Sequence, residues 1–179
     1  MNRGEIVRFF ERLGQRYTQP ADLFLIGGAA LCLLGNPRTT LDIDFIGSDF
    51  PPSEQRAPGT LREVLETLAV EMQIVIDHVP LEQFIPLPSD GAARHHFVGV
   101  FGSLQVFIFD PYAIALSKLD RGLPSDIQDI AFLISRDLIA LTEFVAIVEW
   151  ALSRAVEFGL NQGEMRARLT QLQKGLQRE

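Results

Sequence analysis

Residues 23–46 read LFLIGGAALCLLGNPRTTLDIDFI, and this stretch decides the fold. Leu23–Ile26 is a short apolar run that predicts a strand ending at Gly27-Gly28. The residues after the two glycines have a helix-forming composition, and Gly35 is the expected C-cap of that helix. The first half of the stretch therefore predicts a strand, a tight turn and a helix.

The second half of the stretch predicts a strand that carries two acidic residues. Thr39–Ile46 combines β-branched residues with alternating polarity. Positions i and i+2 of a strand point to one face, so Asp42 and Asp44 project together while Ile43 and Phe45 face the core. Two adjacent carboxylates repel each other unless a cation lies between them. Mg²⁺ prefers such oxygen ligands, and a pair of these ions serves phosphoryl transfer.

The rest of the chain predicts an α+β fold, with a mixed β-sheet flanked by helices and a helical C-terminal third. The pattern predicts a core domain over 1–135, with C-terminal helices over 136–179 packed on the same domain. Phe residues alternate through the expected hairpin, which predicts that they serve sheet packing and form no base-stacking platform. The expected elements are helices over 4–17 and 60–72, loops over 47–59 and 80–96, a strand over 73–79, hairpin strands over 97–101 and 104–109, helices from Pro111 and Pro124, and longer helical stretches over 137–158 and 161–177.

Composition excludes several classes of protein. The chain has 179 residues, 47% hydrophobic and 22% charged, which is the balance of a globular domain with a real core. Cys32 is the single cysteine, so no internal disulfide is expected. No apolar run reaches the length of a membrane span and the N-terminal segment is rich in charge, so we expect no membrane association, no export signal and a cytoplasmic location.

The charge balance bears on the partners of the protein. Lys and Arg number 16 against 23 Asp and Glu, a net charge of −7. Broad binding to nucleic acid depends on basic residues that neutralise phosphates, so we expect none here. A small phosphorylated ligand that arrives with metal ions remains compatible with this charge.

In this order and spacing, Ile26-Gly27-Gly28 and Asp42-Ile43-Asp44 resemble the signature of the DNA-polymerase-beta-like nucleotidyltransferase superfamily. Thirteen residues, 29–41, separate the two halves of the signature. The wider string looks most like a small bacterial branch that includes abortive-infection toxins and stand-alone proteins. The later SKLDRGLPSDIQDI resembles the second motif of that branch, so the resemblance spans roughly residues 23–134.

The resemblance implies transfer of a nucleoside monophosphate from an NTP donor to a hydroxyl or phosphate acceptor, with release of pyrophosphate. Asp42 and Asp44 would bind the metal, with two Mg²⁺ ions expected and Mn²⁺ as an alternative. The family places a third carboxylate on the next strand, where Asp77 is expected as metal ligand or base. Asp110 competes for that role, although a helix N-cap before Pro111 also explains it.

The resemblance also implies residues that bind the nucleotide. Gly27 and Gly28 would let the backbone approach the triphosphate. Arg38 and Thr39 lie just before the acidic strand, where Arg38 would bind a phosphate oxygen through its planar fork. Lys118 is a further candidate for phosphate charge, although it could instead extend to solvent from its helix.

Simpler interpretations account for other residues. Asp126 is expected to be structural at a helix start, and Asp129 fits either interpretation. His95 and His96 are expected on the surface or in a loop, and Cys32 in the core.

Two functions compete at this level. One is an active enzyme whose acceptor is a small molecule, a protein or an RNA end. The other is a non-catalytic nucleotide-binding or regulatory module, such as one partner of a toxin–antitoxin pair. Retention of both Asp42 and Asp44 favours the enzyme. Nucleotide binding without pyrophosphate release would favour the module, so the two are separable by experiment.

Overall fold

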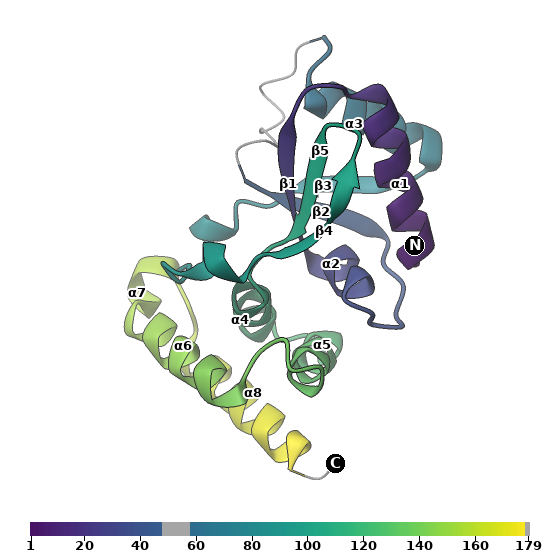
Figure 1. Ribbon diagram of the computed structural model, residues 1–179. Coiled ribbons are helices and arrows are strands. Elements are labelled where there is room, and N and C mark those ends of the chain that lie inside the picture. Colours follow the sequence, from purple (N-terminus) through teal and green to yellow (C-terminus); the bar gives the residue numbers. More distant parts are fainter. Residues whose placement is uncertain (48–57, 178–179) are drawn as a thin grey trace. The chain divides into compact units, whose positions relative to one another are not determined.

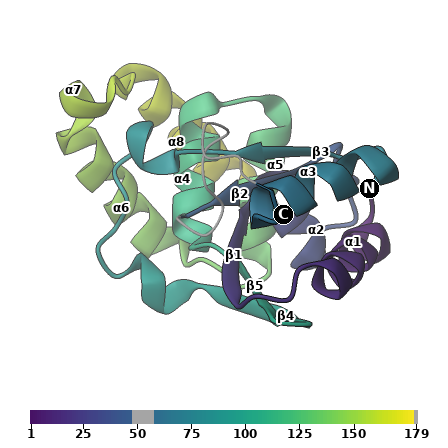
Figure 2. The same ribbon diagram turned by 90° about the horizontal axis from the view of Figure 1, so that it is seen from above.

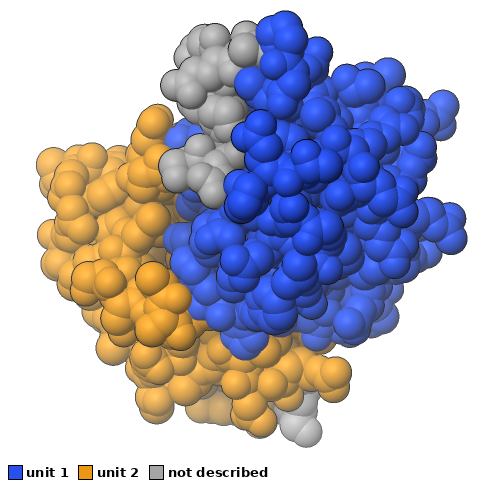
Figure 3. Space-filling view, turned by 45° about the horizontal axis from the view of Figure 1, so that its top comes forward, with its two compact units in different colours: residues 1–80, 95–109 blue, residues 81–94, 110–179 orange. Residues whose placement is uncertain are grey.

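The computed structural model describes residues 1–47 and 58–177, and most of the predicted loop over 47–59 lies outside them. The chain forms two compact units. Figure 3 colours them separately. Unit 1 comprises Met1–Pro80 and His95–Phe109, and unit 2 comprises Leu81–Arg94 and Asp110–Glu179. The division into a core over 1–135 and C-terminal helices over 136–179 stays a prediction.

Unit 1 contains the sheet and the helices that flank it (Figure 1). The predicted order of elements is confirmed throughout this unit. The second strand starts at Asp42 rather than at Thr39. The helix that follows the first strand starts directly at Gly27, so the tight turn predicted at Gly27-Gly28 is absent. The elements are α1 (Arg3–Arg16), β1 (Ala21–Ile26), α2 (Gly27–Leu33), β2 (Asp42–Ile46), α3 (Leu61–Met72), β3 (Val75–His78), β4 (His96–Phe101) and β5 (Leu104–Ile108).

The five strands form one mixed sheet in the order β3-β2-β1-β5-β4. β1 pairs with β2 antiparallel and with β5 parallel, β2 pairs with β3 parallel, and β4 and β5 form the predicted hairpin. The mixed α+β sheet expected from the sequence is therefore confirmed. β2, the acidic strand, lies between two neighbours, so its backbone is held by hydrogen bonds on both sides.

One face of the sheet is the core of unit 1. Leu25, Ile43 and Phe45 are fully buried there. Phe10 of α1 packs edge-on against Phe45, with ring centroids 6.2 Å apart. α3 lies beside α1, as Figure 2 shows. Burial of these side chains fixes the register of β2, because a slip by one residue would turn both aspartates into the core.

The opposite face of the sheet carries Phe97 and Phe107 of the hairpin. Phe97 pairs with Phe107 across β4 and β5, and Phe97 is 58% exposed. Phe101, after a shift of register in β4, instead packs toward Phe10 at 5.6 Å. The Phe residues of the hairpin are thus divided between the two faces, whereas the sequence predicted one packing role for all of them.

Unit 2 is helical apart from short connections, as predicted for the C-terminal third. The predicted stretch over 137–158 is wrong as one helix, because the chain breaks into two helices at Arg154. The predicted loop over 80–96 contains two short 3-10 turns. The elements are η2 (Leu81–Gln83), η3 (Gly91–Arg94), α4 (Pro111–Arg121), α5 (Pro124–Ser135), α6 (Leu141–Ser153), α7 (Ala155–Phe158) and α8 (Gln162–Leu176).

None of the helices among the described residues combines the length and the apolar character that a membrane crossing requires.

Candidate functional site

The two aspartates of β2 lie on one face of the sheet. Asp42 and Asp44 are half-buried, whereas Ile43 and Phe45 between and after them are fully buried on the other face. The alternation expected from the sequence is confirmed. Two carboxylates are therefore held side by side on an internal strand, which leaves their backbone little freedom to separate.

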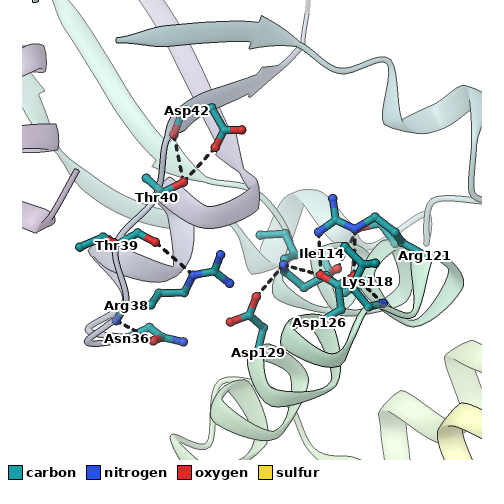
Figure 4. A network of polar contacts seen from close by, with 12 residues as sticks. Asn36, Arg38, Thr39, Thr40, Asp42, Ile114, Lys118, Arg121, Asp126 and Asp129 are labelled. Atoms are coloured by element: carbon teal, nitrogen blue, oxygen red, sulfur yellow. Dashed lines mark hydrogen bonds and ion pairs between the residues drawn. The ribbon is translucent and has the colours of Figure 1, made fainter. Parts of the chain in front are cut away.

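Thr40 fixes the first of these carboxylates. Its hydroxyl donates a hydrogen bond of 2.9 Å to Oδ1 of Asp42, and its side chain is only 5% exposed (Figure 4). The neighbouring Thr39, which was predicted from the sequence to bind the nucleotide, is exposed. Thr40 stands two residues before Asp42, as Asp42 stands two residues before Asp44. This alternation was the signal that could have identified Thr40.

Gly27 and Gly28 allow the start of α2 to approach this strand closely. Gly27 has φ +67°, and a Cβ there would overlap the carboxylate of Asp44. A Cβ on Gly28 would overlap the hydroxyl of Thr40. Both glycines are thus required by the packing of α2 against the acidic strand, whatever ligand the site binds. The close approach also places the backbone of both glycines next to residues of the acidic segment, Asp44 and Thr40.

Arg38 lies on the same side of unit 1. Its Nη2 is 3.8 Å from the position that a Cβ on Gly28 would occupy. Its backbone amide donates to Oδ1 of Asn36 at 3.1 Å, and its carbonyl accepts from the buried thiol of Cys32 at 3.2 Å. The segment before β2 is therefore anchored at both polar atoms of the Arg38 backbone. The predicted core position of Cys32 is confirmed.

Asp77 stands on β3 directly opposite Asp44. Paired residues of neighbouring strands point to the same face, so the Asp77 side chain shares the face of the two β2 carboxylates. It is exposed, unlike the half-buried Asp44. The order of elements from which Asp77 was predicted is confirmed, and its role as third carboxylate stays a prediction.

Asp110 has a different environment, in unit 2. It is fully buried, caps α4 by accepting from the Tyr112 amide at 2.9 Å, and accepts two hydrogen bonds from Arg94, at 3.0 and 2.7 Å. The guanidinium of Arg94 lies 5.1 Å from the centre of the Tyr112 ring. The N-cap interpretation of Asp110 is confirmed, since its Oδ1 accepts from the Tyr112 amide, and Oδ2 is bound by Arg94 of η3.

The donor set on β2 fits a hard divalent cation. Asp42 and Asp44 supply carboxylate oxygens, which Mg²⁺ prefers, on a rigid strand. Over residues 1–47 and 58–177, no three His, Cys, Asp or Glu side chains are grouped closely enough to hold a metal ion. His95 packs between Phe24 and Phe109 at 4.7 and 4.8 Å, among rings rather than carboxylates.

Unit 2 contains the residues of the second sequence motif, which form a buried ionic network (Figure 4). Nζ of Lys118 donates to Asp126 at 3.2 Å and to Asp129 at 2.8 Å, and Lys118 is 4% exposed. Arg121 forks onto Asp126 with hydrogen bonds of 2.8 and 2.6 Å. The alternative in which Lys118 extends to solvent is wrong. Asp126 has the structural role predicted for it, and Asp129 joins it.

The electrostatics of Asp126 follow from these contacts. Burial alone would raise the pKa of its carboxyl. The hydrogen bonds from Arg121 and the charges of Lys118 and Arg121 outweigh burial and hold that pKa below its ordinary value. Asp126 is therefore ionised at neutral pH, as its partners require.

Comparison with known proteins identifies a family. Residues 5–155 match the model of a family described as nucleotidyltransferase of unknown function (DUF6036). Searches of curated proteins and of solved structures found no match. The matched range covers the acidic strand, both glycines, Asp77 and the ionic network of α4 and α5.

Proposed function

We propose a function from the premise that the chain belongs to the family of nucleotidyltransferases of unknown function (DUF6036). The protein transfers a nucleoside monophosphate from an NTP to a hydroxyl or phosphate acceptor and releases pyrophosphate. The observation that carries this proposal is the arrangement of Asp42 and Asp44 on one face of β2, with Gly27 packed against Asp44. We also propose that the protein belongs to the branch that includes abortive-infection toxins.

The residues of unit 1 divide the task between them. Asp42 and Asp44 would hold Mg²⁺, and the hydroxyl of Thr40 orients Asp42 for that purpose. Bound Mg²⁺ supplies charge stabilisation for the transferred phosphoryl group. Asp77, on the same face, would accept the proton of the acceptor hydroxyl, or would complete the metal site by moving closer to the two carboxylates of β2 when the metal binds.

The phosphates of the donor require positive or amide partners. Gly27 and Gly28 would offer backbone amides to the phosphates, and the guanidinium of Arg38 lies close to Gly28. A guanidinium binds phosphate oxygens through two parallel hydrogen bonds. Thr39 and Lys118 remain predicted nucleotide contacts, and Lys118 also neutralises Asp126 and Asp129 within unit 2.

The test is release of pyrophosphate from each of the four NTPs with Mg²⁺, across small-molecule, protein and RNA acceptors. We expect Asp44→Asn to abolish release. Asp137→Asn is the matched control, because Asp137 is exposed and its φ of 54° suits Asn equally well. If NTPs bind and no acceptor supports release, the protein is instead the regulatory module; if Asp44→Asn keeps full activity, the assignment of the site is wrong.

A further inference from the structure

A cluster of aromatic rings lies on the sheet of unit 1. We call it the aromatic face, and its members come from β1, from β4 with the residue before it, and from β5 with the residue after it. Phe24 and Phe107 stack at 5.2 Å with ring planes 19° apart, and Phe97 lies 5.4 Å from Phe107. The aromatic face consists of Phe24, His95, Phe97, Phe107 and Phe109.

The aromatic face shares the side of the sheet on which the carboxylates of β2 lie. Ile26 pairs with Asp44 across β1 and β2, so these two side chains point the same way. Phe24 stands two residues before Ile26 and therefore points to that side as well. Its neighbour Phe107, directly opposite on β5, extends the row away from the carboxylates.

The spacing along β1 suits one nucleotide. Phe24 stands three residues before Gly27, which is about 10 Å along a strand. Asp44 lies beside the segment between them, opposite Ile26. Along β1, the glycines come first, then the carboxylate of Asp44, then the ring of Phe24. An NTP presents its terminal phosphates, its α-phosphate and its base in the same order.

Core packing does not account for these rings, so the proposal below departs from the sequence prediction that the Phe residues of the hairpin form no base-stacking platform. The aliphatic residues of β5 serve the core, and Leu104 and Val106 are fully buried on the other face. Phe97 keeps 58% of its surface exposed, and Phe107 is only partly buried. Aromatic side chains bind nucleobases by stacking and by edge-to-face contact, and tolerate any base because every base has a π-face.

We propose that the aromatic face binds the nucleobase of the donor NTP. The inference rests on the proposed function, because that function places the triphosphate at Gly27 and Gly28. Phe24 and Phe107 contact the base, and Phe97 limits the site at the edge of the sheet. Since stacking recognises any base, discrimination among the four NTPs is weak.

Calorimetry with two ligands tests the assignment. ATP and inorganic tripolyphosphate, each with Mg²⁺, are titrated into the wild-type protein, Phe107→Leu and Phe24→Leu, with folding checked by circular dichroism. The matched control is Val100→Ala, which removes exposed apolar surface from the same hairpin without removing a ring. We expect wild type to bind ATP more tightly than tripolyphosphate. The Phe variants lose about tenfold in ATP affinity, with tripolyphosphate unchanged.

The outcomes separate the two proposals. If ATP and tripolyphosphate bind wild type equally, or both Phe variants keep wild-type ATP affinity, the aromatic face does not bind the base, while the phosphate site stands. If Val100→Ala weakens ATP binding as much as Phe107→Leu does, the loss is not specific to the rings and the inference fails. If neither ligand binds wild type, the proposed function fails and this inference with it. Phe107→Leu decides the result if Phe24→Leu does not fold.

Discussion

At the scale of residues, the candidate site depends on close contacts between the start of α2 and the acidic segment, which leave no room for a side chain at Gly27 or Gly28. Gly28 approaches Thr40, and the hydroxyl of Thr40 donates a hydrogen bond to Asp42. A hydrogen bond to one oxygen of a carboxylate fixes its rotamer, so the other oxygen has a defined direction. The position of Asp42 is therefore set by two residues that have no charge.

Thr40→Val tests this positioning. The substitution keeps the branched shape and removes the hydroxyl, and it is expected to cost about 1 kcal/mol of folding stability because a buried hydrogen bond is lost. We expect binding of Mg²⁺ with ATP to weaken severalfold, as measured by calorimetry, and Thr40→Ser to restore it. Wild-type affinity in Thr40→Val would show that the hydroxyl does not position Asp42.

Gly28→Ala tests the close approach of α2. The added Cβ overlaps Thr40, so we expect a loss of about 1–3 kcal/mol in the free energy of unfolding. Gly175→Ala in α8 is the matched control, because a Cβ there meets no atom within 4 Å and alanine favours a helix. Urea denaturation measures both variants; equal stability of Gly28→Ala and wild type would contradict this packing.

At the scale of elements, α4 and α5 are joined by the buried network of Lys118, Asp126 and Asp129. Removing one member of a buried ion pair leaves an uncompensated charge, which costs more than the pair contributes. We expect Lys118→Met to lose about 3–5 kcal/mol of unfolding free energy in urea. The exposed pair of Arg166 and Glu149 is the control, and Arg166→Ala should change stability little. A small effect of Lys118→Met would contradict the network.

The same network predicts a dependence of stability on pH. The folded state lowers the pKa of Asp126, so its carboxylate contributes stability above the unfolded pKa and loses that contribution as pH falls through the folded value. Between about pH 5 and pH 3, wild type should therefore lose more stability than Asp126→Asn does. Parallel losses in thermal melts across that range would contradict this assignment.

At the scale of the whole molecule, hydrophobic periodicity accounts for most of the fold. The alternation in β2 and the apolar face of α1 correspond to burial in the structure, because one buried side per element leaves a regular pattern in the chain. Strand order and the division into two compact units leave no such pattern, since they depend on contacts between distant residues. The break at Arg154 was missed because the apolar composition continues across it.

The candidate site was predictable only where it depends on local spacing in the sequence. Asp42 and Asp44 were found because their spacing is local. Thr40 was missed although it continues that alternation, and the close approach of Gly28 to it is visible only in three dimensions. Lys118, Asp126 and Asp129 lie in one sequence motif. That Lys118 is buried between the two carboxylates could not be predicted, because it depends on the packing of α4 on α5.

The central claim is that Asp42 and Asp44 form a metal-dependent nucleotide site. The most direct measurement is calorimetric titration of each NTP, with and without Mg²⁺, into wild type and the double variant Asp42→Ala/Asp44→Ala, with folding checked by circular dichroism. We predict binding that requires Mg²⁺ and that weakens at least about tenfold in the double variant. Binding that is unchanged by the double substitution, or no binding of any NTP to wild type, would contradict the claim.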